Sequence, residues 1–321
     1  MQTKVVIFQF VVLGYLLSIS QCKLLSQVVQ TTDTQNETSQ VSSDESKPPC
    51  QYTPIVFIHG LSTNCTLQEP LMTQISDMMN NSVYYSCVEI GNGNETSWYT
   101  PLFDQTKEAC QKLMDHPVYS KEKVNIIGYS QGGLIARALV ETCPAIKFRK
   151  LITFGTPHGG IAAVRDCQND TACLEWNEQV RATVYTKYTQ QHLAPAGYFR
   201  DYTQLPAYYK YSSFLPYINN EKGDAAMKYL QKSRLLALEH FRMFMFTRDR
   251  IVYPKESAWF ANFNEKGRLV LLQDQELYKK DWLGMRALTE SNRATYYSIE
   301  GAHMEFTQDY LEENLLPLLI D

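Results

Sequence analysis

The chain has 321 residues, 44% of them hydrophobic and 20% charged, and its formal net charge is −4. This length can bury one substantial core, and it suits a single α/β domain with an insertion. The small negative charge gives no strong positive field, which argues against a nucleic acid partner.

The first 20 residues have the three parts of a secretory signal peptide. A basic residue precedes an apolar run over residues 5–17, and small residues then favour cleavage before Gln21, with cleavage after Cys22 as the alternative. The apolar run is too short for a comfortable transmembrane helix, so we expect no transmembrane segment; a retained membrane anchor is the alternative. Residues 21–49 are rich in Ser, Thr, Gln and Asp and indicate a disordered leader.

A secretory route determines how the cysteines are interpreted, because cysteines form disulfides in an oxidising compartment. Their scattered spacing lacks the C-x-x-C pairs of zinc modules, so we expect disulfides and no metal. N-x-S/T sequons, which accept glycans in secreted proteins, indicate the same compartment. The cysteines are Cys22, Cys50, Cys65, Cys87, Cys110, Cys143, Cys167 and Cys173, and the sequons begin at Asn36, Asn64, Asn80, Asn94 and Asn169.

A domain over residues 50–321 alternates apolar runs with amphipathic stretches, which predicts a mostly parallel sheet with helices on both faces. Helical spacing marks residues 134–140 and 306–319. A run at residues 269–272 would be one further strand. The main strands are predicted over residues 54–58, 83–90, 124–127, 150–154, 241–246 and 295–299.

The alternation is interrupted over residues 161–240, which are dense in tyrosine. A long insertion at this place usually forms a helical cap over the active site of a hydrolase, and we predict one here. Its tyrosines would either contact substrate or pack the cap against the sheet.

The third predicted strand ends in the motif Gly128-Tyr-Ser-Gln-Gly132, and a helix-forming segment follows. A G-x-S-x-G motif between a strand and a helix is the nucleophile elbow of α/β hydrolases. The glycines permit a tight turn, which exposes the serine hydroxyl at a helix N-terminus that favours negative charge. We therefore predict an α/β-hydrolase fold with Ser130 as nucleophile; an ordinary glycine-rich turn is the alternative.

A serine nucleophile requires a histidine base and an acid that orients it. In this fold the acid and then the histidine follow the serine along the chain, each on a loop after a strand. Asp249 and His303 fit, and exposed loop positions are the alternative for both; Asp274 and Glu276 are other candidates for the acid. The remaining histidines precede a strand, follow none, or precede or closely trail the serine: His59, His116, His158, His192 and His240.

Two backbone amides should stabilise the oxyanion. We expect one from Gln131, directly after the nucleophile, and one from Leu61, in the His59-Gly-Leu61 loop after the first strand. His59 itself is interpreted as a hydrogen-bonding residue that holds this loop.

Longer segments resemble the palmitoyl-protein thioesterases of the lysosome, from about residue 54 to residue 319. Esterases in general share the serine and histidine motifs. More particular to this family are Tyr211-Ser-Ser-Phe-Leu-Pro-Tyr-Ile-Asn-Asn-Glu221 and Asp249-Arg-Ile-Val-Tyr-Pro-Lys-Glu-Ser-Ala-Trp-Phe260. The segments over residues 155–159 and 198–202 depart from the family pattern, which leaves acyl-chain length open.

The resemblance implies a lysosomal or secreted enzyme, without cofactor, that removes palmitoyl groups from S-acylated cysteines of proteins through an acyl-serine. It implies Ser130, Asp249 and His303 as catalytic residues, and disulfides Cys110–Cys143 and Cys167–Cys173. The pairing of the other cysteines stays open. An O-ester lipase, an acyl-CoA thioesterase and an inactive lipid-binding homologue are the alternatives.

The chemistry of a palmitoyl thioester agrees with this interpretation. A thiol has a pKa near 8.5, so a thiolate leaves with little need for protonation. A C16 chain has about 14 methylenes, and burial at ~0.8 kcal/mol each gives on the order of 11 kcal/mol. We therefore expect a long apolar groove with residues 161–240 as its wall.

Overall fold

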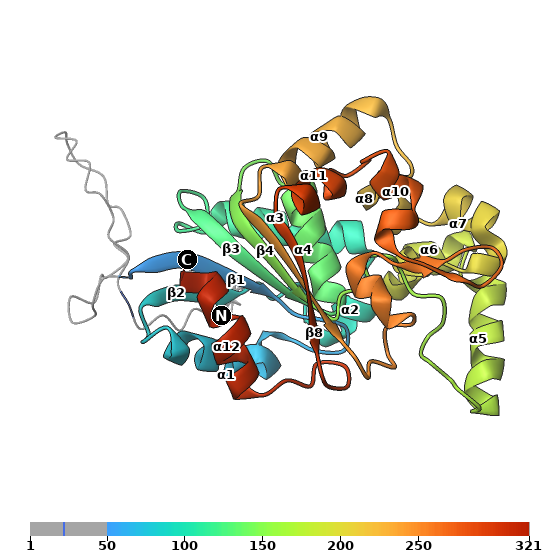
Figure 1. The fold of residues 1–321 in the computed structure, drawn as a ribbon, viewed down its shortest axis with the longest axis horizontal. Coiled ribbons are helices and arrows are strands. Elements are labelled where there is room, and N and C mark those ends of the chain that lie inside the picture. The colour runs from blue at the N-terminus through green and yellow to red at the C-terminus, as the bar shows by residue number, and fades with distance from the viewer. Residues whose placement is uncertain (1–21, 23–49, 321) are drawn as a thin grey trace, which may run out of the picture.

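A computed structural model describes Cys22 and residues 50–320; the predicted signal peptide, the rest of the predicted leader and Asn36 lie outside the described residues. Six strands form one parallel sheet in the order β2-β1-β3-β4-β5-β8. This sheet, with helices on both faces, confirms the predicted fold class (Figure 1). The strands are β1 (Tyr52–Ile58), β2 (Val83–Cys87), β3 (Lys123–Tyr129), β4 (Lys147–Phe154), β5 (His240–Phe246) and β8 (Ala294–Ile299).

The two faces of the sheet bury different sets of side chains. Successive residues of a strand point to opposite faces, so Val56 and Ile58 of β1 join one hydrophobic cluster, whereas Ile55 and Phe57 join the other. The first cluster includes α3 (Leu102–Asp115), α4 (Gln131–Thr142), α9 (Ala225–Leu236) and α11 (Met285–Glu290). The second includes α1 (Cys65–Met78), α12 (Gln308–Asn314) and α13 (Leu316–Ile320).

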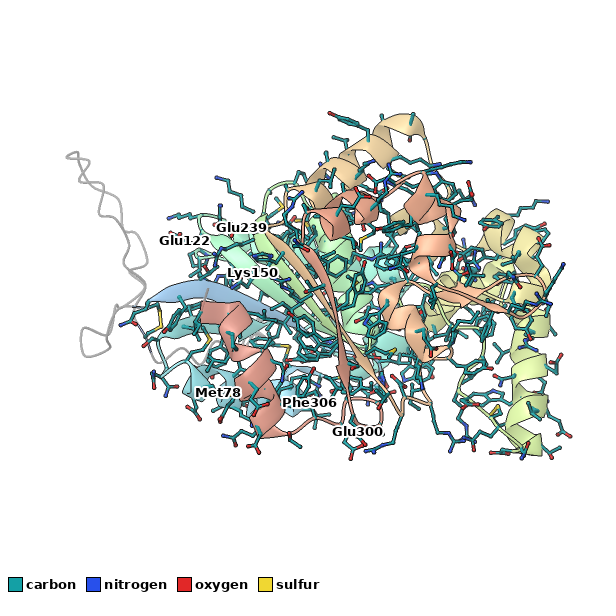
Figure 2. The ribbon with its side chains drawn as sticks, viewed as in Figure 1. Met78, Glu122, Lys150, Glu239, Glu300 and Phe306 are labelled. Carbon is teal, nitrogen blue, oxygen red and sulfur yellow. A yellow bond between two sulfur atoms is a disulfide. The ribbon has the colours of Figure 1, made fainter. Side chains whose placement is uncertain are left out.

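The carboxyl ends of four neighbouring strands meet at one edge of the sheet. In the register, Tyr129 of β3 lies beside Phe154 of β4, and Phe246 of β5 lies beside Ile299 of β8. Glu300, just after β8, and Phe306 lie towards this edge, whereas Glu122, just before β3, and Glu239, just before β5, lie at the opposite edge (Figure 2).

The segment between β4 and β5, residues 155–239, is called here the β4–β5 insertion. It contains α5 (Thr171–Thr183), α6 (Lys187–His192), α7 (Leu205–Tyr211) and α8 (Leu215–Ile218), and α9, which packs on α4. Its tyrosines differ in exposure, since Tyr198 and Tyr208 are buried while Tyr188 and Tyr211 are exposed. Tyr198 and Tyr208 therefore belong to the packed interior of the insertion.

The run over residues 269–272, predicted as a further strand, forms a strand only at Leu269–Val270, and this strand lies outside the main sheet. Leu269–Val270 (β7) pairs only with Asn262–Phe263 (β6), in a small antiparallel sheet apart from the main one. A 3-10 turn at Leu272–Asp274 and α10 (Glu276–Lys279) follow. Leu269 and Leu271 are exposed, so this apolar run does not enter the core as a sheet strand would.

Four disulfides join the cysteines: Cys22–Cys50, Cys65–Cys87, Cys110–Cys143 and Cys167–Cys173. The last two are the pairs that the resemblance implies, and the first two are pairs that the sequence left open. Among the described sequons, Asn80, Asn94 and Asn169 are exposed, while Asn64 is half-buried and caps α1. No helix within the described part of the chain is long and apolar enough to cross a membrane.

Candidate active site

Ser130 occupies the turn between β3 and α4 with a backbone conformation that few non-glycine residues adopt, φ 51° and ψ −124°. Its N–H donates to the carbonyl of Phe154 (2.8 Å), and its carbonyl accepts from Gly133 (3.0 Å). A Cβ added at Gly132 would clash with the carbonyl oxygen of His59. The motif therefore needs glycine here because α4 starts against the loop that follows β1.

The structure brings Ser130, His303 and Asp249 into one hydrogen-bonded chain. His303 Nε2 lies 3.0 Å from Ser130 Oγ, and His303 Nδ1 lies 2.6 Å from Asp249 Oδ2. An ionised carboxylate only accepts hydrogen bonds, so Nδ1 carries the proton and Nε2 is left to accept from the serine hydroxyl. The three residues follow β3, β8 and β5, whose carboxyl ends meet at this edge.

Asp249 is held in place by the turn that it begins. Its Oδ1 accepts the backbone N–H groups of Ile251 (2.8 Å) and Val252 (2.9 Å). The carboxylate is buried, with 2% of the side chain exposed, so its two oxygens are oriented by protein groups. Asp274 and Glu276, the other candidates for the acid, belong to the segment from the 3-10 turn to α10, and the carboxylate that contacts His303 is that of Asp249.

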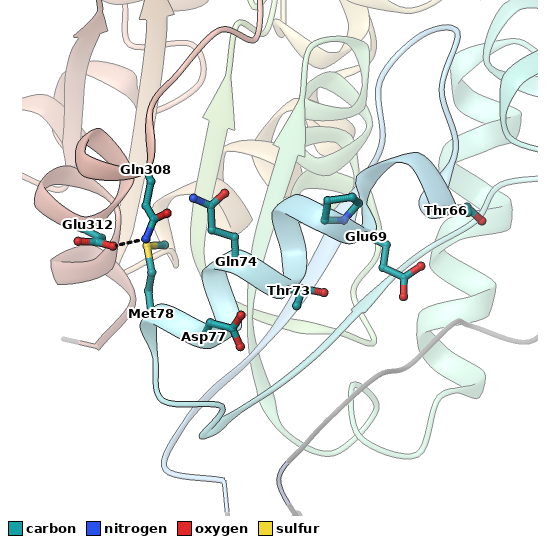
Figure 3. Close-up of a pocket in the computed structure, with 9 residues that line it drawn as sticks. Thr66, Glu69, Thr73, Gln74, Asp77, Met78, Gln308 and Glu312 are labelled. Atoms are coloured by element: carbon teal, nitrogen blue, oxygen red, sulfur yellow. Dashed lines mark hydrogen bonds between the residues drawn. The ribbon is translucent and has the colours of Figure 1, made fainter.

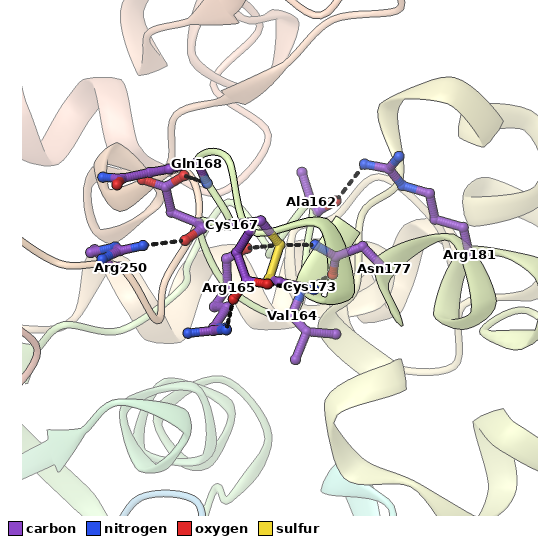
Figure 4. The surroundings of a disulfide bond; sticks show 11 residues. Ala162, Val164, Arg165, Cys167, Gln168, Cys173, Asn177, Arg181 and Arg250 are labelled. Carbon is purple, nitrogen blue, oxygen red and sulfur yellow. Dashed lines mark hydrogen bonds and ion pairs between the residues drawn. A yellow bond between two sulfur atoms is a disulfide. The ribbon is translucent and has the colours of Figure 1, made fainter. Parts of the chain in front are cut away.

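The loop that carries Asp249 is fastened to the β4–β5 insertion. Asp166 N–H donates to the carbonyl of Arg250 (2.8 Å), and Arg250 Nη2 donates to the carbonyl of Asp166 (3.1 Å). The Cys167–Cys173 disulfide closes the adjoining turn, where Asn177 Oδ1 accepts from Val164 N–H (2.8 Å; Figure 4). These contacts couple the loop that carries Asp249 to the insertion, and no motif in the sequence indicates the hydrogen bonds among them.

The loop after β1 passes beside Ser130 and contains Leu61, one of the two residues expected to donate to the oxyanion. A Cβ added at Gly60 would lie 3.2 Å from Ser130 Cβ. His59 Nδ1 lies 3.0 Å from the carbonyl of Gly60, and His59 Nε2 lies 3.1 Å from Glu89 Oε1. Glu89 Oε2 in turn accepts the N–H of Cys65, at the start of α1 (2.9 Å).

Sequence reasoning missed Glu89, which fastens the His59–Leu61 loop to α1. Burial raises the pKa of this carboxyl, but the hydrogen bonds from His59 and from the Cys65 amide outweigh burial, so the pKa lies below its ordinary value. Gln131, the other expected donor, is buried and donates through Nε2 to the carbonyl of Ser97 (2.7 Å). The loop after β1, beside Ser130, is thus fixed by the contact of His59 with Glu89. The start of α4 is fixed by the hydrogen bond from Gln131.

An apolar cavity of about 560 Å³ opens at Ser130 and His303. Most of its wall comes from the β4–β5 insertion, including Val180, Val184 and Phe199, and the acid loop contributes Val252. The lining is mostly aliphatic and aromatic, so this space suits a hydrocarbon chain better than a polar group.

A second depression, of about 520 Å³, meets the same residues from the side of α1. It shares Leu61, Ser130 and His303 with the apolar cavity, but most of its other lining residues come from α1, with Met304 and Phe306 beside them. Ser130 thus lies where two spaces of different chemistry meet. Among the described residues, no group of three or more His, Cys, Asp and Glu is placed to hold a metal ion.

Behind Ser130, a buried charged pair connects α4 to the insertion. Arg137 Nη1 donates to Glu141 Oε1 (2.9 Å) and to the carbonyl of Ile218 (2.7 Å), while Nη2 donates to Asn219 Oδ1 (2.7 Å). Burial raises the pKa of Glu141 to about 7, although the Arg137 guanidinium lowers it. Glu141 thus favours its protonated form in the folded protein more than it would in water.

Most of the chain is similar in sequence to known proteins. A family model described as Palmitoyl protein thioesterase matches residues 54–303. Palmitoyl-protein thioesterase 3 of Dictyostelium discoideum is 32% identical over 274 residues, which are 83% of this chain and 92% of that protein. Palmitoyl-protein thioesterase 1 of Caenorhabditis elegans is 26% identical, with 86% and 94% covered.

A third relative is Lysosomal thioesterase PPT2-B of Xenopus laevis, which is 27% identical over 78% of this chain and 85% of its own. The family match covers the strand that leads to Ser130, the insertion, the acid loop and His303. On these grounds the chain belongs to the palmitoyl-protein thioesterase family of α/β hydrolases.

Proposed function

We propose that this protein is a serine thioesterase that removes long-chain acyl groups, palmitoyl among them, from S-acylated cysteines of proteins or peptides. One observation carries the proposal: the hydrogen-bonded chain of Ser130, His303 and Asp249 opens onto an apolar cavity, in a member of this family.

In the acylation step, Ser130 Oγ attacks the thioester carbonyl while His303 Nε2 takes the hydroxyl proton. Asp249 stabilises the imidazolium that forms, because its carboxylate lies 2.6 Å from Nδ1. The backbone amides of Leu61 and Gln131 would stabilise the oxyanion. The C–S bond then breaks and the acyl group remains on Ser130. The departing thiolate takes the proton from His303 Nε2, so a thiol leaves and the imidazole is neutral again.

In the deacylation step, a water molecule replaces the departed thiol beside His303. His303 Nε2 takes a proton from this water, the resulting hydroxide attacks the acyl carbonyl, and a second oxyanion forms. When it collapses, the C–O bond to Ser130 breaks, the serine regains its proton from His303, and the free fatty acid leaves.

The apolar cavity is the natural place for the acyl chain during both steps. Each methylene that leaves water contributes about 0.8 kcal/mol to binding, so the binding free energy of a long acyl chain is far more favourable than that of a short one. A lysosomal or secreted location also belongs to this proposal. Its supports are the four disulfides and the lysosomal thioesterases among the relatives.

The proposal is tested with a long-chain alkyl fluorophosphonate, which labels an activated serine covalently, followed by peptide mass spectrometry. We expect one label, at Ser130, in the wild-type protein, and no label in Ser130→Ala or in protein preloaded with S-palmitoyl peptide. Folded protein that takes no label, or that is labelled at another serine, would contradict the proposed nucleophile.

A further inference from the structure

A groove leads from Ser130 along α1, away from the β4–β5 insertion. The depression that contains Ser130 and His303 is continued by another of about 560 Å³, because both are lined by Pro70 and Gln74 of α1. The continuation is lined by Asp77 and Met78 of α1 and by Gln308 and Glu312 of α12, and Met78 lies beside the two α12 side chains (Figure 3). The two depressions together are called here the α1–α12 groove.

The character of the α1–α12 groove changes along its length. Near Ser130 it is uncharged and partly apolar, with Leu71 and Phe306 in its wall. Further away it is lined by three carboxylates, those of Glu69, Asp77 and Glu312. No lysine or arginine lines either depression, and none occurs in the described helices α1, α12 and α13.

The reaction requires a space of this kind. While the acyl chain is bound to Ser130, it fills the apolar cavity, so the thiol half of the substrate has to occupy and leave the other space that reaches Ser130 and His303. A cysteine within a polypeptide brings its neighbouring residues along, and these must lie against the surface that continues this space.

We propose that the α1–α12 groove binds the polypeptide next to the acylated cysteine and favours sequences with lysine or arginine there. The proposal rests on the thioesterase function proposed above and names the partner of that same site. From Leu67 to Asp77, α1 rises about 15 Å at ~1.5 Å per residue. An extended peptide advances ~3.3 Å per residue, so about four or five substrate residues span the groove.

The test uses short S-palmitoyl peptides of equal length in which the residues beside the cysteine are lysine, serine or glutamate. We expect kcat/KM of the lysine peptide to exceed that of the serine peptide about threefold to tenfold, and the glutamate peptide to be the poorest, because exposed charge pairs contribute modestly. The preference should shrink as salt concentration rises.

Charge reversal in the groove should invert the ranking of the peptides, whereas misfolding would lower activity on all of them. In the double variant Asp77→Lys, Glu312→Lys, the glutamate peptide should become a better substrate than the lysine peptide. Glu122→Lys is the matched control, since Glu122 is exposed at the opposite edge of the sheet (Figure 2), and it should keep the wild-type ranking.

S-palmitoyl-N-acetylcysteamine, which has no polypeptide part, separates this proposal from the thioesterase function. If the wild-type enzyme hydrolyses it but turns over the three peptides equally, the groove proposal is overturned and the thioesterase function stands. If no palmitoyl thioester is hydrolysed, both proposals are overturned.

Discussion

Ser130, His303 and Asp249 lie far apart in the chain, and each is oriented by the backbone around it. The serine is held by the strained turn before α4, and the aspartate by the N–H groups of Ile251 and Val252. His303 lies between them with 16% of its side chain exposed. Its proton is therefore positioned by the fold before any substrate arrives.

Replacement of Asp249 by asparagine should lower kcat by about 10³- to 10⁴-fold with little change in KM. An amide can donate to Nδ1 of His303, which would leave the proton on Nε2 and make the histidine unable to accept from Ser130. Steady-state kinetics with a palmitoyl thioester, together with a melting curve, would measure this effect. Asp274→Asn and Glu276→Gln serve as controls. A large loss of kcat in either control, with Asp249→Asn still active, would show that Asp249 is not the acid.

Among the elements, α5 and the segment after it form a large part of the wall of the apolar cavity. Val180 and Val184 line the cavity, and the Cys167–Cys173 disulfide fixes the turn that leads into this helix. The loop that carries Asp249 is hydrogen-bonded to the same turn. The wall of the apolar cavity and the position of Asp249 are thus supported by one set of contacts.

Filling the cavity from this wall should shift the acyl preference towards short chains. In Val184→Trp, the ratio of kcat/KM for palmitoyl to that for octanoyl thioester should fall at least tenfold, since the larger side chain occupies space that methylenes need. Gln179→Trp, at an exposed position of α5, is the control. An unchanged ratio in folded Val184→Trp would place the acyl chain elsewhere.

The strands of the main sheet could be predicted because their apolar runs are continuous and end in loops with special residues. The positions of Ser130, Asp249 and His303 could be predicted because this fold orders its catalytic groups along the chain. The residues that anchor them could not, since Glu89 acts through His59 and Arg250 through the backbone of Asp166, contacts that only folding creates. The apolar run over residues 269–272 resembles a strand of the main sheet. In the structure, only two of its residues form a strand, which pairs in a small hairpin, and the run itself does not reveal this.

The buried carboxyl group of Glu141 links the stability of the whole molecule to pH. In the folded protein the pKa of Glu141 is raised to about 7 by burial, against 4.5 as its ordinary value. Below pH 4.5 the carboxyl is protonated in both states, so its contribution to stability is fully present. As pH rises through about 7, the unfolded state has already released this proton and the contribution is lost.

Glu141→Gln should remove this pH dependence. Between pH 4.5 and above 7, the free energy of unfolding of the variant should rise relative to wild type by on the order of 3 kcal/mol. Urea denaturation at several pH values would measure the difference, with the exposed Glu122→Gln as control. A difference that stays constant with pH would show that Glu141 titrates alike in both states.

The thioesterase function is tested by comparing hydrolysis of a palmitoyl thioester with that of the matched palmitoyl oxygen ester, by the purified protein and by Ser130→Ala. We expect a thioester rate far above the oxygen-ester rate, and loss of the thioester rate in the variant. Comparable turnover of the oxygen ester, or thioester turnover that survives in Ser130→Ala, would contradict it.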